Sequence, residues 1–145
     1  MKWITREKVK VDRVACPWLI KKFIDPQGEF LFVPADEVTQ KTAELGATMY
    51  DVDGCELGHH GEDVSFNSLL KVFKLADPAL QLLGEIVRAA DSHPTNPHPA
   101  GEGLRWVAFG FSALGLSDQE VLAREFVVYD ALYAECQRRS QRSPR

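Results

Sequence analysis

Groups that can bind a metal or carry a proton are most densely gathered in residues 56–66. This stretch holds two adjacent histidines, His59 and His60, three carboxylates, and glycines at positions 58 and 61. Glycine lets a backbone bend where a side chain would forbid it, so a turn can present the imidazoles. The stretch indicates a metal or proton-transfer site, and the alternative is a pair of surface histidines.

We predict a metal site made of His60 and Glu62 from this stretch, with Asp91 and Asp130 from farther along the chain. One or two imidazoles with carboxylates suit zinc, iron or manganese. Asp130 is the only charge in the apolar and aromatic run 126–133, and a buried carboxylate needs a partner. The alternatives are a salt bridge to an arginine or an exposed position for Asp130, and a backbone hydrogen bond at a helix end for Asp91.

A second candidate site lies where a helix is predicted to begin at Asp12. Arg13 and the free amides of a helix N-terminus both favour oxyanions, so they could bind one together. The same helix end could lower the pKa of Cys16 and make it a redox-reactive thiolate. The alternatives are an ion pair for Arg13 and a core position beside Trp18 for Cys16.

Length and composition predict a single domain over residues 1–139 and a disordered basic tail over 140–145. The 45% hydrophobic content is typical of a soluble protein, and no apolar run approaches the roughly 20 residues that cross a membrane. The N-terminus lacks a signal peptide's apolar core, so we expect a cytoplasmic location. The net charge of −4 argues against direct nucleic acid binding, and three cysteines without a C-x-x-C pair predict reduced thiols.

The N-terminal half is predicted to form a small mixed sheet with a β-α-β unit. Apolar runs predict strands at residues 3–6, 29–33 and 48–52, and helical spacing predicts helices at 12–24 and 35–45. The near-continuous apolarity of 29–33 indicates a central strand buried on both faces. Residues 55–57 could add a brief edge strand before the histidine turn.

Everything after Asp63 is predicted to be helical, which gives an α/β (α+β) fold whose all-helical C-terminal half packs with the sheet as one domain. Asp63 is the expected N-cap of the first of these helices, over 63–73. The others are expected at 77–90, at 104–116 as a buried apolar helix, and at 117–138 after a capping box.

Several motifs resemble the chromate-resistance family, specifically the C-terminal domain of ChrB-type proteins. They are residues 10–20 (KVDRVACPWLI), 23–26 (FIDP), 30–34 (FLFVP), 60–62 (HGE), 65–66 (SF), 86–91 (IVRAAD) and 128–134 (VYDALYA). The resemblance covers nearly the whole chain in the same order. The chain departs from the pattern at Val64, where relatives often have cysteine, and at Glu135, where they often have tryptophan.

The resemblance implies a role in bacterial chromate resistance, where longer members are chromate-responsive regulators of an operon that includes an efflux transporter. The additional N-terminal region of those members is missing here, so we do not expect a DNA-binding regulator. We expect a metal- or oxyanion-binding domain whose ligands include a divalent transition metal and chromate or another oxyanion. The alternatives are a metal-dependent enzyme that reduces or hydrolyses an oxyanion, and a non-catalytic module that packs against a regulator or forms a homo-oligomer. No phosphate loop, G-x-S-x-G or H-E-x-x-H motif assigns catalytic residues.

Overall fold

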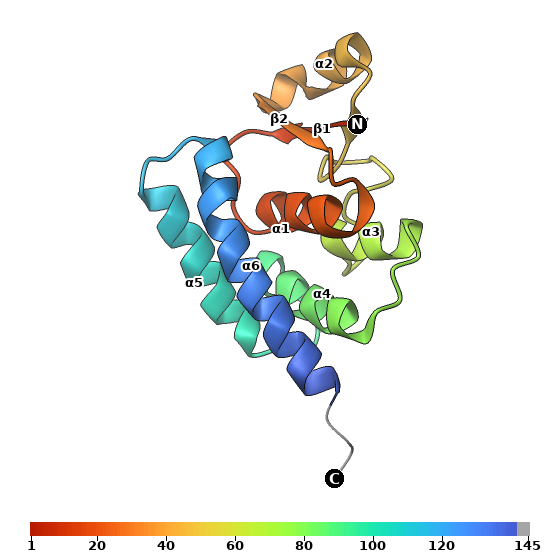
Figure 1. The fold of residues 1–145 in the computed structure, drawn as a ribbon. Coiled ribbons are helices and arrows are strands. Elements are labelled where there is room, and N and C mark those ends of the chain that lie inside the picture. Colours follow the sequence, from red (N-terminus) through yellow and green to blue (C-terminus); the bar gives the residue numbers. More distant parts are fainter. Residues whose placement is uncertain (142–145) are drawn as a thin grey trace.

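The computed structural model describes residues 1–141, which form a small sheet followed by a helical half (Figure 1). The strands are β1 (Lys2–Arg6), β2 (Glu29–Val33) and β3 (Thr48–Met49). The helices are α1 (Asp12–Leu19), α2 (Val38–Leu45), α3 (Ser65–Val72), α4 (Pro78–Asp91), α5 (Ala100–Ala113) and α6 (Asp118–Ser140). A π-helical turn, Ile20–Ile24, extends α1, and a 3-10 turn, Ala35–Glu37, leads into α2. The predicted α+β class is confirmed; residues 142–145 of the predicted tail lie outside the described residues.

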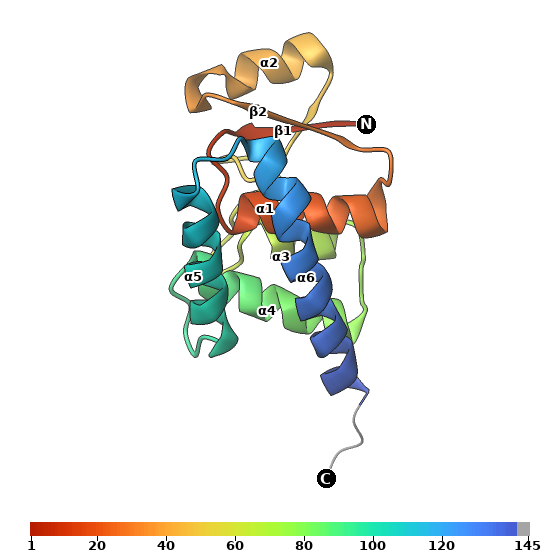
Figure 2. The ribbon, with the colours of Figure 1, turned by 60° about the vertical axis from the view of Figure 1, so that its left-hand side comes forward.

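The three strands are all parallel, so the sheet is not mixed as predicted, and they lie in the order β2-β1-β3. The prediction that residues 29–33 form the central strand is therefore wrong, because β1 lies between β2 and β3. The first crossover leaves β1 in one direction and the second returns past it. Right-handed crossovers must then place α1 and α2 on opposite faces of the sheet, and Figure 2 shows this arrangement. The inner strand is buried at Trp3, Ile4 and Thr5.

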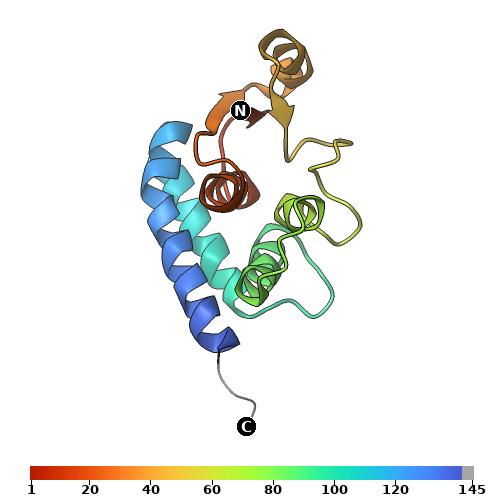
Figure 3. The ribbon, with the colours of Figure 1, turned by 45° about the vertical axis from the view of Figure 1, so that its right-hand side comes forward.

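Helix α1 is the centre of the helical layer. It packs against α3, α4 and α6, and Figure 3 shows it between the α5–α6 pair and the α3–α4 pair. Its buried residues include Trp18 and Leu19, and the Trp18 ring meets the Tyr133 ring of α6 edge-on at 5.6 Å. The predicted capping box at the start of α6 is confirmed, because Ser117 accepts a hydrogen bond from the Glu120 amide and Glu120 accepts one from the Ser117 amide.

Three local predictions from the sequence are wrong. Asp63 is not the N-cap of α3, which begins at Ser65; its carboxylate instead forms ion pairs with Lys71 and Arg88. Residues 55–57 form turns and not a strand. Helix α5 is buried on one side only, and Trp106 is 76% exposed. Within residues 1–141, none of the helices combines the length and the apolarity that crossing a bilayer would require.

Candidate metal centre

Three aspartates surround the imidazole of His59. The Nε2 atom of His59 lies 3.1 Å from Asp51 Oδ1, 3.3 Å from Asp91 Oδ2 and 3.4 Å from Asp12 Oδ2. Donor atoms of Asp12, His59 and Asp91 all lie within 4.8 Å of one another. Across residues 1–141, this is the one set of three or more histidine, cysteine or carboxylate side chains that is compact enough to hold a metal ion. We call Asp12, Asp51, His59 and Asp91 the His59 cluster.

Four separate segments supply the cluster. Asp12 opens α1, Asp91 ends α4, Asp51 follows β3, and His59 belongs to the loop before α3. Asp51 comes after the carboxyl end of its parallel strand, the edge at which open α/β sheets commonly bind ligands. Its backbone has a φ of 51°, which non-glycine residues adopt rarely. The Asp51 amide donates to the carbonyl of Leu57 at 2.9 Å, and this hydrogen bond closes the turn of residues 51–57 that precedes His59.

Asp12 is 1% exposed and caps α3 from a distance of more than 50 residues in the sequence. Its Oδ2 accepts a hydrogen bond from the Ser65 amide at 2.7 Å, and its Oδ1 accepts one from the Phe66 amide at 3.1 Å. Burial, and then the negative charge of Asp51, raise the pKa of Asp12 to about 7, whereas its hydrogen bond with His59 lowers it. The two α3 amides satisfy the carboxylate and fix the direction in which its remaining lone pairs point.

Asp51 has cationic and hydroxyl partners of its own. The Ser65 hydroxyl donates to Asp51 Oδ1 at 2.8 Å, and Arg13 Nε lies 3.6 Å from Asp51 Oδ2. Arg6 Nη2 also lies 4.0 Å from Asp51 Oδ2. Within residues 1–141, His59 is the one cationic side chain that forms ion pairs with Asp12 and Asp91. These two carboxylates share a single positive charge, which favours binding of a further cation.

His59 is the link between the three carboxylates. Its hydrogen bonds with Asp12, Asp51 and Asp91 raise its pKa to about 12, although partial burial opposes the shift. Its side chain is 45% exposed and that of Asp91 is 21% exposed, so the cluster opens to solvent on this side. An ion could therefore reach the donor atoms from solvent.

Of the four ligands predicted from the sequence, the structure brings only Asp91 into the cluster. His60 is exposed, and its Nε2 lies 2.9 Å from the carbonyl oxygen of Glu56. Glu62 accepts hydrogen bonds from the hydroxyl and the amide of Thr95, at 2.8 and 3.0 Å, and these bonds lower its pKa. The side chains of His60 and Glu62 thus form local hydrogen bonds at the surface and do not reach the His59 cluster.

Asp130 lies on the other side of α1. It accepts a hydrogen bond from the indole Nε1 of Trp18 at 2.8 Å, and the ammonium group of Lys22 lies 3.4 Å from the same carboxylate oxygen. Its side chain is 47% exposed. Asp130 therefore forms a salt bridge, as the alternative to a metal site predicted, but with a lysine and not an arginine.

Arg13 and Cys16 lie next to the cluster, but their environments differ from the expected ones. Besides Asp51, the Arg13 guanidinium donates to the backbone carbonyls of Glu7 and Lys8, so each of its three nitrogens already has a partner within the protein. The Cys16 thiol is fully buried and donates to Asp12 Oδ1 at 3.4 Å. Burial, and then the charge of Asp12, raise the pKa of Cys16 well above its usual value. The prediction from the sequence that the helix end lowers this pKa is therefore wrong.

His59, Asp12 and Asp51 belong to the cluster but were not among the ligands predicted from the sequence. The backbones of His60 and Asp63 exchange two hydrogen bonds of 3.0 Å, which leaves the His60 side chain exposed while the preceding imidazole turns toward the aspartates. The presence of two adjacent histidines was the available signal, but the sequence gives no means of choosing between them. The sequence predicted Asp12 only as the residue at which a helix begins.

The family model described as ChrB, C-terminal domain, matches residues 3–136. Protein ChrB of Cupriavidus metallidurans is 37% identical over 132 residues, which make up 90% of this chain and 39% of that protein. The chain thus spans about two fifths of the length of this curated relative. No solved structure matches the chain. The chain belongs to the family of the ChrB C-terminal domain, the chromate-resistance family that its motifs resemble.

Proposed function

We propose that this domain binds one divalent transition metal ion through Asp12, His59 and Asp91, and that it contributes through this site to chromate resistance or sensing. The observation that carries the proposal is the convergence of these three donors within 4.8 Å from three separate segments. Exposed acidic residues often cluster without a function. Here one carboxylate is buried, and an imidazole nitrogen lies between the carboxylates.

The donor set limits the choice of metal. Only a neutral imidazole can be a ligand, so the metal would displace the proton on His59 Nε2 into solvent. One imidazole with two carboxylates suits iron, manganese or zinc better than copper(I), which prefers sulfur. Three protein ligands leave coordination positions for water or for a ligand oxygen. An oxyanion such as chromate could bind at such a position, and this connects the metal site to the role that the family resemblance implies.

The residues behind the ligands support the same proposal. The Ser65 and Phe66 amides orient Asp12, and the Ser65 hydroxyl and Arg13 hold Asp51 beside His59. Partners of this kind fix the orientation of metal ligands, and their loss typically weakens metal binding by about 10- to 100-fold. The site thus has both donors and the contacts that would hold them in place.

Metal content should distinguish the structural assignment from the sequence-based one. We expect about one metal ion per chain in wild-type protein after incubation with Zn²⁺, Mn²⁺ or Fe²⁺ and removal of the excess, measured by elemental mass spectrometry. His59→Ala and Asp91→Asn should retain less than about a tenth of this amount, because each removes a ligand. His60→Ala and Asp130→Asn are the matched controls and should keep the full amount. The proposal would be contradicted if His60→Ala lost the metal while His59→Ala kept the full amount.

A further inference from the structure

The outward side of α5 is uncharged over about three turns. We define the α5 face as Gly103, Trp106, Phe109, Gly110, Ala113 and Leu114, which are all exposed. Trp106 is 76% exposed, Leu114 62% and Phe109 51%. A helix that is apolar on all sides is normally buried, and a contiguous exposed apolar patch usually marks an interaction site. The sequence prediction of a buried helix is thus met on one side only.

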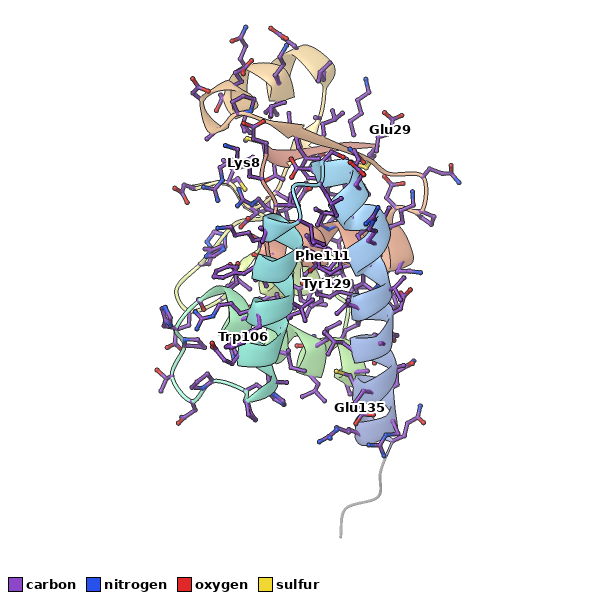
Figure 4. The ribbon with its side chains drawn as sticks, turned by 90° about the vertical axis from the view of Figure 1, so that its left-hand side faces the viewer. Lys8, Glu29, Trp106, Phe111, Tyr129 and Glu135 are labelled. Carbon is purple, nitrogen blue, oxygen red and sulfur yellow. The ribbon has the colours of Figure 1, made fainter. Side chains whose placement is uncertain are left out.

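The inner side of α5 is fully used. Leu104 and Ala108 are buried, and Gly101 contacts Ala89 of α4 so closely that an added Cβ would lie 2.4 Å from the Ala89 Cβ. Figure 4 shows α5 and α6 side by side, with Trp106 on α5. The Trp106 indole donates to Glu102 Oε1 at 3.3 Å, and Glu102 also forms an ion pair with Arg105 at 2.6 Å. Glu102 and Arg105 beside the face are therefore paired with each other, and the Lys10 ammonium lies 4.9 Å from the centroid of the Phe109 ring.

The α5 face combines one large side chain with two open positions. A Cβ built on Gly103 or on Gly110 would meet nothing within 4 Å. These glycines are seven residues, or about two helical turns, apart, so they lie on the same side of α5. Trp106 lies between them. Glycine at such positions lets the backbone of a second helix approach closely.

We propose that the α5 face packs against the α5 face of a second copy of this chain, with the two helices antiparallel. A two-fold axis requires each contact to occur twice, so the surface must complement itself. If Trp106 of one copy lies over Gly110 of the other, the symmetry places the second Trp106 over the first Gly110. The same register sets Gly103 opposite Ala113. Trp106 then meets a small residue in both copies, and the same register sets Phe109 opposite Val107 and Leu114 opposite Glu102.

The area of the face fits a second copy. From their exposed fractions, Trp106, Phe109 and Leu114 together offer about 400 Å² of side-chain surface per copy. With the glycine and alanine surface between them, two copies would bury about 1,200 Å², the lower end for specific interfaces. The net charge of −4 would repel another copy; the six residues of the α5 face are uncharged, and the Lys10 ammonium lies 4.9 Å from the centroid of the Phe109 ring. An antiparallel pair also sets opposite helix dipole ends together.

The test is sedimentation velocity over a range of protein concentrations. We expect wild-type mass to rise from monomer to dimer with concentration. Trp106→Glu should remain monomeric, because it places a charge at the centre of the face. The control is Leu45→Glu, which introduces the same charge at a 40% exposed leucine of α2, at the opposite end of the molecule in Figure 1, and should dimerise like wild type. Circular dichroism verifies that both variants fold. A wild type that stays monomeric throughout, or a Trp106→Glu variant that dimerises equally, would overturn the proposal.

Tryptophan fluorescence locates the interface in the same samples. Trp3 and Trp18 are 0% and 1% exposed, so Trp106 alone of the three tryptophans should change environment on association. Its emission should move to shorter wavelength as dimer forms. A dimer without this change would place the contact elsewhere on the molecule and overturn the proposal. The α5 face shares no residue with the His59 cluster, so failure here leaves the metal proposal separately testable.

Discussion

Replacing Asp12 with alanine is expected to lower the free energy of unfolding by about 3 kcal/mol or more. The variant leaves the Ser65 and Phe66 amides at the start of α3 without acceptors in a buried place, and His59 loses one of its three carboxylates. Removing one partner of a buried charged group costs more than removing an exposed one. Urea denaturation followed by circular dichroism measures the loss.

Two further variants separate the capping role of Asp12 from metal binding. Asp12→Asn should cost nearly as much as Asp12→Ala, because both carboxylate oxygens accept amide hydrogens and a carboxamide can offer only one oxygen. Asp91→Asn should lose metal with little change in stability, since its side chain is 21% exposed and has no such backbone partners. Equal stability of wild type and Asp12→Ala would show that Asp12 does not hold α3 in place.

Replacing Glu125 with methionine is expected to stabilise the protein by about 3–5 kcal/mol at pH 9 and much less at pH 4. Glu125 lies on α6, is 0% exposed, and neither of its carboxylate oxygens has a hydrogen-bond partner among residues 1–141. Burial raises its pKa to about 8. Methionine has a similar shape and brings no charge to the site.

The sign of the effect follows from proton binding. Between the usual glutamate pKa of 4.5 and the folded-state value of about 8, the folded protein keeps a proton that the unfolded chain has released. Stability from this group therefore falls as the pH rises through that window, and above it the folded state must carry an unpaired buried charge. The contribution is fully favourable only below pH 4.5.

Urea denaturation of wild type and Glu125→Met between pH 4 and pH 9 isolates this group, because the other titrating residues are the same in both proteins. The difference in unfolding free energy should grow with pH. Glu125→Gln is the control: it should also remove the pH-dependent part, but with a smaller gain, because its amide remains unpaired in the core. Parallel curves for wild type and Glu125→Met would mean that Glu125 does not titrate in this range.

Local patterns in the sequence predicted the helical half well. Ser117 and Glu120 form a capping box within four residues, and Pro78 follows Asp77 at the start of α4, so neighbouring residues carry the whole signal. The prediction of the α3 cap was wrong because the true partner is distant in the sequence. Asp63 has the residue type of a cap, but the α3 amides bind Asp12, and no local pattern contains a partner more than 50 residues away.

The candidate site was predictable only in part. Asp91 was predicted to lie beside His60, but it lies beside His59. The orientation of the two adjacent imidazoles depends on hydrogen bonds between His60 and Asp63 that the sequence does not reveal. Asp130 is the only charge in an apolar run, and this isolation indicated that the carboxylate has a partner without identifying it. The structure shows two partners, the Trp18 indole and the Lys22 ammonium group. The order of the strands likewise depends on two crossovers and not on the apolarity of one strand.

The most direct test of the metal site is an anomalous scattering measurement on crystals of the protein loaded with Zn²⁺ or Mn²⁺. The account predicts one strong peak at about 2.0–2.2 Å from His59 Nε2 and from a carboxylate oxygen of each of Asp12 and Asp91. A peak at His60 and Glu62 instead, or no peak at the His59 cluster in metal-loaded crystals, would contradict it.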